Sequence, residues 1–288
     1  MQKVTKNILK KVYSPRPSDV HKYDYGLLLV IGGGEFYTGS PALAGMAAFK
    51  AGVDMVQILA PARAANIIAS FSPNLAAYPL EGKWLDKKNL ATLISMTEAA
   101  NQVAPDRAAI VIGGGLGRSD ETKETVSEYL KRIKVKAVVD ADGIYAIAKN
   151  SEVIKGKNFL ITPHSFEFFV LTGREIKDLS FEEKVKVVQE EAAKLGCVIL
   201  LKGKKDIISD GKEVVLNETG SPFLSVGGTG DTLAGICGSL LAQGQSPFLA
   251  AQAGAFINSR AGEIAVKKFG PSLTATDLIE AIPEAIKA

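Results

Sequence analysis

The stretch Gly227-Gly228-Thr229-Gly230-Asp231 runs directly into an apolar segment of helical period, Thr232 to Gln243. Glycines before a helix let its unpaired backbone N–H groups approach an anion, and the helix dipole favours negative charge there. We therefore expect an anion hole at Gly228, Thr229 and Gly230. Asp231 would be a poor neighbour for a phosphate unless it takes a proton from a hydroxyl that attacks that phosphate. The alternative is that Asp231 only caps the helix, since Asp is a favoured N-cap residue.

Upstream of this loop, short apolar runs alternate with longer segments of helical period, which is typical of βαβ units and predicts an α/β fold with a mainly parallel sheet. The expected strands are Leu27–Ile31, Met55–Leu59, Ala108–Ile112, Ala137–Val139, Phe159–Ile161 and Val198–Leu201. The expected helices are Pro41–Ala51, Ala62–Ser70, Lys87–Val103, Thr122–Arg132, Gly143–Lys149, Phe181–Leu195, Thr232–Gln243, Pro247–Phe269 and Thr276–Ile286. Ile207–Ser209 and Glu213–Leu216 are expected to form an antiparallel hairpin around Asp210-Gly211, because Asp-Gly is a strong turn signal.

The composition narrows the class of protein. The chain has 288 residues, 47% apolar and 23% charged, which is ordinary for a packed soluble protein, and no linker divides it, so we expect one domain over residues 1–288. A formal net charge of +3 with interspersed signs does not indicate a nucleic-acid partner. Cys197 and Cys237 are expected to be small buried residues in a reducing compartment. Since the sequence has neither a membrane-spanning apolar run nor a signal peptide, we expect a cytoplasmic location without a membrane partner.

Ligands of open α/β sheets bind at the carboxyl ends of the strands, and two of these positions are rich in glycine. Gly32-Gly33-Gly34 follows the first expected strand and leads to Ser40, which can cap a helix that begins at Pro41. Gly113-Gly114-Gly115-Leu116-Gly117 follows the third, where glycines allow close backbone approach or positive φ. Neither loop has the spacing of a P-loop or of a Rossmann dinucleotide site.

Acidic residues follow the next two strands. Asp140, Asp142 and Glu167 are placed where they could hold Mg²⁺ through water or orient polar substrate groups. Each also has a structural explanation, because Asp142 can cap the next helix and Glu167 can complete a capping arrangement. His164 lacks partners at metal-ligand spacing, so we expect it to hydrogen-bond a substrate or its own helix start.

The last expected strand before the hairpin ends in Lys202-Gly203-Lys204-Lys205-Asp206. Lys202 is suited to neutralise nucleotide phosphates. Lys204 and Lys205 are better explained as a solvated basic turn. Together with the polar loop Asn217–Pro222 and the anion hole, this segment predicts a nucleotide-phosphate corner.

This ordered set of motifs resembles the ribokinase-like superfamily and, within it, the ADP- or ATP-dependent NAD(P)H-hydrate dehydratases. The resemblance extends from about Leu27 to Gln243, through VIGGGEFYTGSPALAGMAAFKAGVDMV, VIGGGLG, VVDADGIYAI, LITPHSFEFFVLTG, VILLKG and GGTGDTLAGICGSLLAQG. GGTGD marks the superfamily, whereas TPHSFE, LKG and YTGSPALA indicate the dehydratases, and related vitamin kinases usually have asparagine where this chain has His164. The resemblance implies a three-layer α/β/α fold with a central, mainly parallel sheet.

The resemblance also implies a repair reaction. The S epimer of hydrated NADH or NADPH would be phosphorylated at its ring hydroxyl by ADP or ATP with Mg²⁺, and phosphate would then leave to restore the dinucleotide. Asp231 would be the catalytic base. The hydrate pocket would include Ser40, Gly117, His164 and Asp231, and the nucleotide contacts would be Lys202, Gly203, Lys204, Lys205, Asp206 and Gly230.

Three further expectations follow from the resemblance. The roughly 25 residues before the first strand are too few for the epimerase domain of bifunctional relatives, so we expect a stand-alone dehydratase that depends on a separate epimerase. Symmetric assemblies among relatives imply a homo-oligomer. The alternative function is a ribokinase-like kinase of a vitamin precursor, which would make a stable phosphorylated product; a regulatory nucleotide-binding protein would not need Asp231. The motifs do not decide between ADP and ATP.

Overall fold

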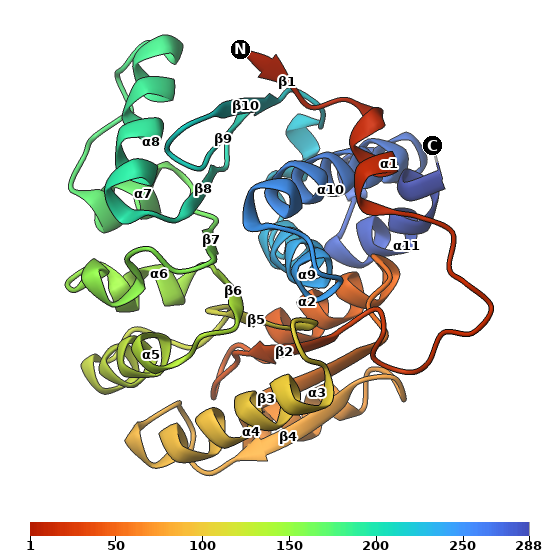
Figure 1. Cartoon of the computed structure of the whole chain (residues 1–288), viewed down its shortest axis with the longest axis vertical. Coiled ribbons are helices and arrows are strands. Elements are labelled where there is room, and N and C mark those ends of the chain that lie inside the picture. Colours follow the sequence, from red (N-terminus) through yellow and green to blue (C-terminus); the bar gives the residue numbers. More distant parts are fainter. Residues whose placement is uncertain (288) are drawn as a thin grey trace.

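A ten-stranded sheet lies between two groups of helices in the computed structural model, which describes residues 1–287 (Figure 1). The strand order is β1-β10-β9-β8-β7-β6-β5-β2-β3-β4. Within the described chain β9 is antiparallel to β8 and β10, and the other neighbouring strands are parallel. The strands are β1 (Gln2–Lys3), β2 (Leu27–Ile31), β3 (Met55–Pro61), β4 (Ala76–Leu80), β5 (Ala108–Ile112), β6 (Lys136–Val139), β7 (Phe159–Ile161), β8 (Val198–Leu201), β9 (Asp206–Ser209) and β10 (Val214–Asn217). The expected three-layer, mainly parallel α/β fold is confirmed.

Each face of the sheet has its own apolar core, because successive side chains of a strand point to opposite faces. One core lies under α1 (Leu9–Val12), α2 (Gly39–Lys50), α3 (Ala62–Ala69), α9 (Thr229–Ala242), α10 (Pro247–Phe269) and α11 (Ala275–Lys287). The other lies under α4 (Leu90–Val103), α5 (Asp120–Arg132), α6 (Asp142–Ile147), α7 (Ser165–Thr172) and α8 (Phe181–Leu195). Short 3-10 helices are η1 (Lys6–Ile8), η2 (Lys87–Asn89), η3 (Ser151–Ile154), η4 (Pro222–Ser225) and η5 (Gly270–Ser272).

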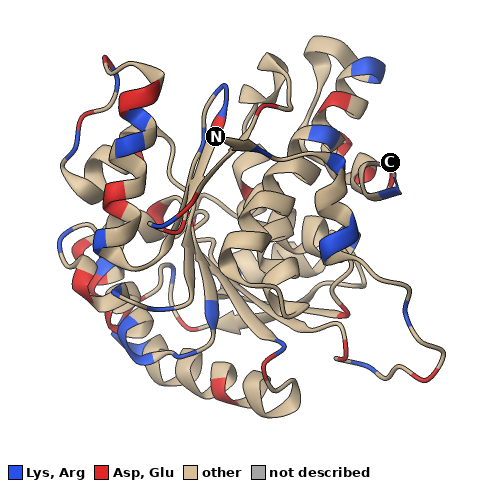
Figure 2. Ribbon diagram, turned by 45° about the horizontal axis from the view of Figure 1, so that its top comes forward, with Lys and Arg blue, Asp and Glu red and all other residues tan. Residues whose placement is uncertain are grey.

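Charged residues of both signs are distributed over the outer helices, although Glu167 on α7 and Glu191 on α8 are buried. In the view of Figure 2, blue and red segments are interspersed along the outer helices, in agreement with the mixed charge pattern of the sequence. Among the helices of residues 1–287, none has both the length and the apolar character needed to cross a bilayer.

Helix α9 packs closely on α2 and on the sheet, as the small residues of its sequence suggest. A Cβ at Gly235 would clash with the backbone of Ala44 in α2, and one at Gly238 would clash with Val111 in β5. The close packing of α9 on α2 and β5 places the first turn of α9 at the carboxyl ends of β5 and β6. The loops after β2, β5, β6, β7 and β8 reach the same edge, because these strands are parallel.

The predicted bounds of β2, β5, β7, β8, α8 and α10 are confirmed, whereas the other predicted elements differ by one to three residues at one or both ends. The edge strand β4 was not predicted, because it is largely exposed and includes Pro79 instead of an apolar run. Helix α7 was expected only through the capping roles of His164 and Glu167, without bounds, and the N-terminal β1 and α1 were missed. Helix α9 starts at Thr229, three residues earlier than expected, so Asp231 lies inside its first turn.

Candidate active site

The first turn of α9 presents unpaired backbone donors. Its N-cap is Gly228, in the left-handed region at φ 95°, and no side chain caps the helix. In the described chain no hydrogen bond is made by the N–H groups of Thr229, Gly230 or Asp231, which are among the first donors of a helix. The geometry is therefore suited to an anion, and the anion hole at Gly228, Thr229 and Gly230 stays a prediction.

Side chains behind this turn hold it in place. The Thr229 hydroxyl lies 2.8 Å from the carbonyl oxygen of Leu224 and 3.0 Å from that of Val226. On α10, Asn258 Oδ1 accepts from Thr232 Oγ1 at 2.7 Å and Asn258 Nδ2 donates to the Thr229 carbonyl at 3.3 Å. Sequence reasoning missed Asn258, although a polar residue in a run of small apolar ones was a usable signal. Thr229 thus supplies its backbone to the site, and its side chain supports the loop.

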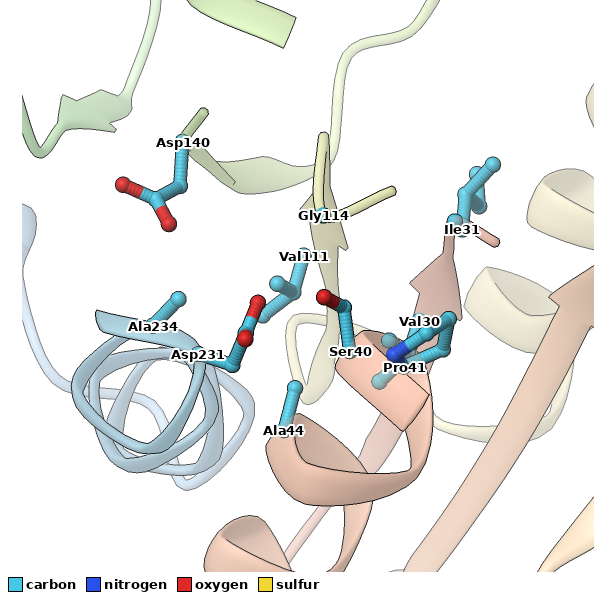
Figure 3. Close-up of a pocket in the computed structure, with 11 residues that line it drawn as sticks. Val30, Ile31, Ser40, Pro41, Ala44, Val111, Gly114, Asp140, Asp231 and Ala234 are labelled. Atoms are coloured by element: carbon cyan, nitrogen blue, oxygen red, sulfur yellow. The ribbon is translucent and has the colours of Figure 1, made fainter. Parts of the chain in front are cut away.

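Asp231 is the third residue of α9 and does not cap it, so the alternative of a capping residue is wrong. Its carboxyl lines a small pocket with Ser40, Asp140 and Gly114, and Figure 3 shows the Ser40 and Asp231 side chains pointing toward one another. Burial and the negative charge of Asp140 raise the pKa of Asp231 to about 7, while a hydrogen bond with Ser40 and the charge of Lys202 lower it. A carboxyl of this pKa can both take up and release a proton near neutral pH.

Ser40 does not cap α2, contrary to expectation. The helix begins at Gly39, its N-cap is Thr38, and no side chain caps it. The Ser40 hydroxyl is therefore available to Asp231 at the floor of the pocket.

Lys202 lies between Asp140 and Glu167, two of the three carboxylates that were considered for Mg²⁺. Its Nζ donates to Asp140 Oδ1 at 2.8 Å and lies 3.6 Å from Glu167 Oε2. Asp140 also accepts from Thr162 Oγ1 at 2.7 Å. Burial alone would lower the pKa of Lys202, but the charges of Asp140 and Glu167 raise it, so the lysine is held as a cation. A Cβ on Gly230 would lie 3.7 Å from this Nζ, so Lys202 faces the unpaired donors of α9.

The acids fit a magnesium ion held mainly by phosphate oxygens and water. Within residues 1–287, no cluster of three or more His, Cys, Asp or Glu side chains could bind a metal, and Lys202 already neutralises Asp140 and Glu167. Mg²⁺ commonly keeps several waters and takes one or two carboxylates besides substrate phosphates. Two carboxylates beside a helix turn with unpaired N–H groups agree with that mode of binding.

His164 and Glu167 cap α7 reciprocally. His164 Nδ1 accepts from the N–H groups of Phe166 and Glu167 at 3.1 and 3.2 Å, and Glu167 Oε2 accepts from the His164 N–H at 2.8 Å. Both expected capping roles are confirmed. The His164 side chain is half exposed, so its contact with a substrate stays a prediction.

Asp142 does not cap α6, which starts after Ala141 without a side-chain cap. Instead, Asp142 Oδ2 accepts from the Gly117 N–H at 2.9 Å, and Oδ1 accepts from Arg118 Nε at 2.7 Å. The carboxylate thus fixes the end of the glycine loop that follows β5. One consequence is that the Gly117 N–H is already used.

The residues of the predicted nucleotide corner have different surroundings in the structure, and their contact with a nucleotide stays a prediction. Asp206 braces the hairpin, with Oδ1 accepting from the Gly203 N–H at 3.0 Å and Oδ2 from Asn217 Nδ2 at 2.9 Å. Lys204 and Lys205 are exposed, as expected of a solvated turn, and Lys205 Nζ pairs with Glu218 at 2.7 Å. Among these lysines, Lys202 alone lies between the acids of the site.

The family of the chain follows from its sequence as a whole. Residues 28–284 match the family model described as NAD(P)H-hydrate dehydratase. The chain belongs to the NAD(P)H-hydrate dehydratase family. This match confirms the resemblance to the NAD(P)H-hydrate dehydratases that the sequence motifs indicated.

Similar proteins agree with this assignment. The "Bifunctional NAD(P)H-hydrate repair enzyme Nnr" of Pyrobaculum aerophilum is 43% identical over 94% of the chain, which spans 52% of that protein. The chain thus has about half the length of several curated relatives. The "ADP-dependent (S)-NAD(P)H-hydrate dehydratase" of Nitrosopumilus maritimus is 34% identical over 99% of the chain and 96% of its own length.

Solved structures of similar proteins share the fold of this family member. A ribokinase-like superfamily protein from Enterococcus faecalis matches with a TM-score of 0.83 and 25% identity, over 99% of this chain and 95% of that one. The ADP/ATP-dependent NAD(P)H-hydrate dehydratase of Bacillus subtilis, co-crystallised with ATP/Mg²⁺, matches with a TM-score of 0.80 and 24% identity, over 99% and 98%. These likenesses confirm the ribokinase-like architecture.

Proposed function

We propose that this protein converts the S epimer of NADH or NADPH hydrate back to NADH or NADPH, through phosphorylation by ADP or ATP and loss of phosphate. The observation that carries the proposal is Asp231, a carboxyl with a pKa of about 7 placed in a helix turn with unpaired N–H groups. The family assignment and the name of the Nitrosopumilus maritimus relative support the substrate and the use of ADP.

In the first step, Asp231 takes the proton of the ring hydroxyl while the hydroxyl oxygen attacks the terminal phosphorus of the nucleotide. The bond between that phosphorus and its bridging oxygen breaks, so AMP leaves when ADP is the donor and ADP leaves when ATP is. The N–H groups of Thr229 and Gly230 stabilise the charge on the transferred group, and Lys202 adds a positive charge beside them.

In the second step, the ring nitrogen donates its lone pair and the carbon–oxygen bond to the phosphate breaks. Phosphate leaves with the bonding electrons, and a proton is lost from the neighbouring ring carbon, which restores the dihydronicotinamide. Phosphate is a much better leaving group than hydroxide, so this step needs little from the protein beyond positioning.

Binding of both substrates is assigned to residues around the pocket. The nucleotide is proposed to contact Lys202–Asp206 and Gly230, and the hydrate to contact Ser40, Gly117, His164 and Asp231. Asp140 and Glu167 are proposed to hold Mg²⁺ through water; when bound, the ion neutralises nucleotide phosphates. Because the Gly117 N–H is bonded to Asp142 and the Cα is covered by the ring of Trp84, a contact there uses the carbonyl of Gly117.

The cellular setting is also a proposal. The two cysteines are free and buried, in agreement with a reducing cytoplasm. Relatives named as bifunctional repair enzymes suggest that an epimerase supplies the S epimer from the R epimer in the same pathway. We further propose a homo-oligomer, to be measured by light scattering coupled to gel filtration.

The test is recovery of the 340 nm absorbance of reduced nicotinamide from purified NADH or NADPH hydrate with Mg²⁺ and ADP or ATP. The expected result is nucleotide-dependent recovery that stops when about half of a mixed-epimer sample has reacted. A control without nucleotide measures spontaneous recovery. Absence of recovery from folded protein that binds nucleotide, with a stable phosphorylated product from a vitamin precursor, would establish the kinase alternative instead.

A further inference from the structure

Two aromatic rings, one on the loop after β2 and one on the loop after β4, pack against each other. Phe36 is 80% exposed and Trp84 is half-buried, with ring centroids 5.9 Å apart and planes tilted by 58°. Trp84 is the single tryptophan of the chain. We call this pair, Phe36 and Trp84, the aromatic shelf. None of the capping or phosphate-binding roles described above accounts for it.

Two glycine loops hold the indole in place. A Cβ on Gly34 would clash with the Trp84 ring, and one on Gly117 would lie 2.9 Å from Trp84 Cζ3. Gly34 follows β2 and Gly117 follows β5, whereas Trp84 follows β4, so the ring reaches across β3 to lie on both loops. These loops also contribute Gly32 and Gly114 to the pocket of Asp231. The shelf is therefore continuous with the site.

The shelf determines what a ligand meets beyond Gly114. The N–H of Gly117 is bonded to Asp142, and the Cα of Gly117 is covered by the indole, so the surface offered at this point of the loop is the ring of Trp84. Lys83 and Arg118, the neighbours in sequence of Trp84 and Gly117, are 76% and 55% exposed, and they pair with Glu35 at 3.7 Å and with Asp142 at 2.7 Å. An accessible aromatic surface suits stacking of a nucleobase.

We propose that the aromatic shelf stacks the adenine ring of the hydrated dinucleotide, an inference that rests on the proposed function. The reacting ring has to reach Asp231 and Ser40, which lie beside Gly114. The shelf lies three residues further along the same loop, at Gly117, so it meets the other end of the dinucleotide.

The test compares two substrates, NADPH hydrate and hydrated reduced nicotinamide mononucleotide, which lacks the adenosine. Trp84→Ala is expected to lower kcat/KM for NADPH hydrate by about tenfold to a hundredfold, the range of base-to-aromatic stacking, mainly through KM. The same variant is expected to keep kcat/KM for the mononucleotide hydrate within about threefold of the wild-type value, and Trp84→Phe is expected to keep most of the activity on both substrates.

Phe36→Ala tests the shelf at an exposed residue, where folding is not at risk. Phe71→Ala, 51% exposed between α3 and β4 at the far ends of the strands, is the matched control.

Fluorescence of Trp84 measures ligand binding at the aromatic shelf independently of the reaction. With ADP saturating, NADP⁺ is expected to quench the emission and nicotinamide mononucleotide to leave it unchanged. Equal losses with both substrates in Trp84→Ala, or no quenching by NADP⁺, would overturn the shelf, as would a change in oligomeric mass in that variant with unchanged kcat/KM. A wild-type protein that is quenched by NADP⁺ but recovers no NADPH would overturn the proposed function and leave the shelf standing.

Discussion

Opposing electrostatic effects act on the pKa of the Asp231 carboxyl. Burial and Asp140 disfavour its charge, whereas Ser40 and Lys202 favour it, and the balance places its pKa at about 7. An ordinary aspartate would be ionised throughout the neutral range and would be a weak base. Burial beside Asp140 thus gives this carboxyl the proton affinity that a general base needs.

Replacing Asp231 by Asn tests its role in the reaction. We expect kcat to fall by about 10²-fold to 10⁴-fold, the usual contribution of a general base, while nucleotide affinity stays near the wild-type value. The wild-type kcat/KM should rise with pH through an apparent pKa near 7, because the base acts when deprotonated. Steady-state kinetics and nucleotide titration calorimetry measure the two effects. Asp120→Asn, an exposed carboxyl on α5, is the control; equal activity of Asp231→Asn and the wild type would refute the assignment.

The same carboxyl affects stability in the opposite direction from most aspartates. Its pKa is near 3.8 when unfolded and about 7 when folded, so between these values the folded protein holds a proton that the unfolded chain has lost. The stability contributed by this proton is therefore lost as pH rises. From pH 5 to pH 8 the group is expected to lower the free energy of unfolding by about 2 to 3 kcal/mol. Urea unfolding at the two pH values should show this loss in the wild type and not in Asp231→Asn; parallel curves would contradict it.

At the scale of the element, the first turn of α9 depends on one glycine. Gly228 has φ 95°, and a Cβ there would lie 2.7 Å from Leu43 Cδ1 and 2.8 Å from Ala275 Cβ. The preceding Gly227 has no atom within 4 Å of a built Cβ and is not in the left-handed region. Two adjacent glycines of one motif therefore differ in their structural need for glycine.

This difference predicts unequal effects of alanine. Gly228→Ala is expected to lower the free energy of unfolding by about 1 to 3 kcal/mol and to weaken nucleotide binding, because the turn has to move. Gly227→Ala should leave the stability within about 0.5 kcal/mol of the wild type. Denaturant unfolding and nucleotide titration measure both variants. Equal stabilities would show that the turn adapts freely to a side chain.

Elements with a strong local pattern could be predicted from the sequence, and the loops between them only partly. Apolar runs gave the bounds of β2 and β5, because strands buried on both faces leave little choice of residue. Capping was less predictable: His164 caps its helix, but Ser40 and Asp142 turn away from theirs toward Asp231 and Gly117. The partners of Ser40 and Asp142 lie on loops that are distant in sequence, so a local sequence pattern does not indicate them. The position of Trp84 on two glycine loops is non-local in the same way.

At the scale of the whole molecule, the N-terminal segment is part of the core. No motif in this segment indicated a structural role, yet Val4, Ile8, Leu9 and Val12 are buried. Strand β1 pairs with β10, and α1 packs on α10. The segment thereby holds the hairpin that carries Lys202–Asp206 against the helices that support α9.

Leu9→Ala is expected to lower the free energy of unfolding by about 2 to 5 kcal/mol, because it leaves a cavity under α1. Lys10→Ala, an exposed neighbour in the same short helix, should change it by less than about 0.5 kcal/mol. Chemical unfolding of both variants measures the difference. If Leu9→Ala were as stable as Lys10→Ala, the N-terminal segment would be an appendage and not part of the core.

Neither edge strand of the central sheet is well suited to pair with a further strand. On one side β1 has two residues, and on the other β4 contains Pro79, which has no N–H to donate. A second copy of the chain therefore has no long row of free backbone groups along which to extend the sheet. Copies of this protein that associate are therefore expected to do so through helices and loops. The same edge strands, β1 and β4, also protect a partly unfolded chain against aggregation by strand pairing.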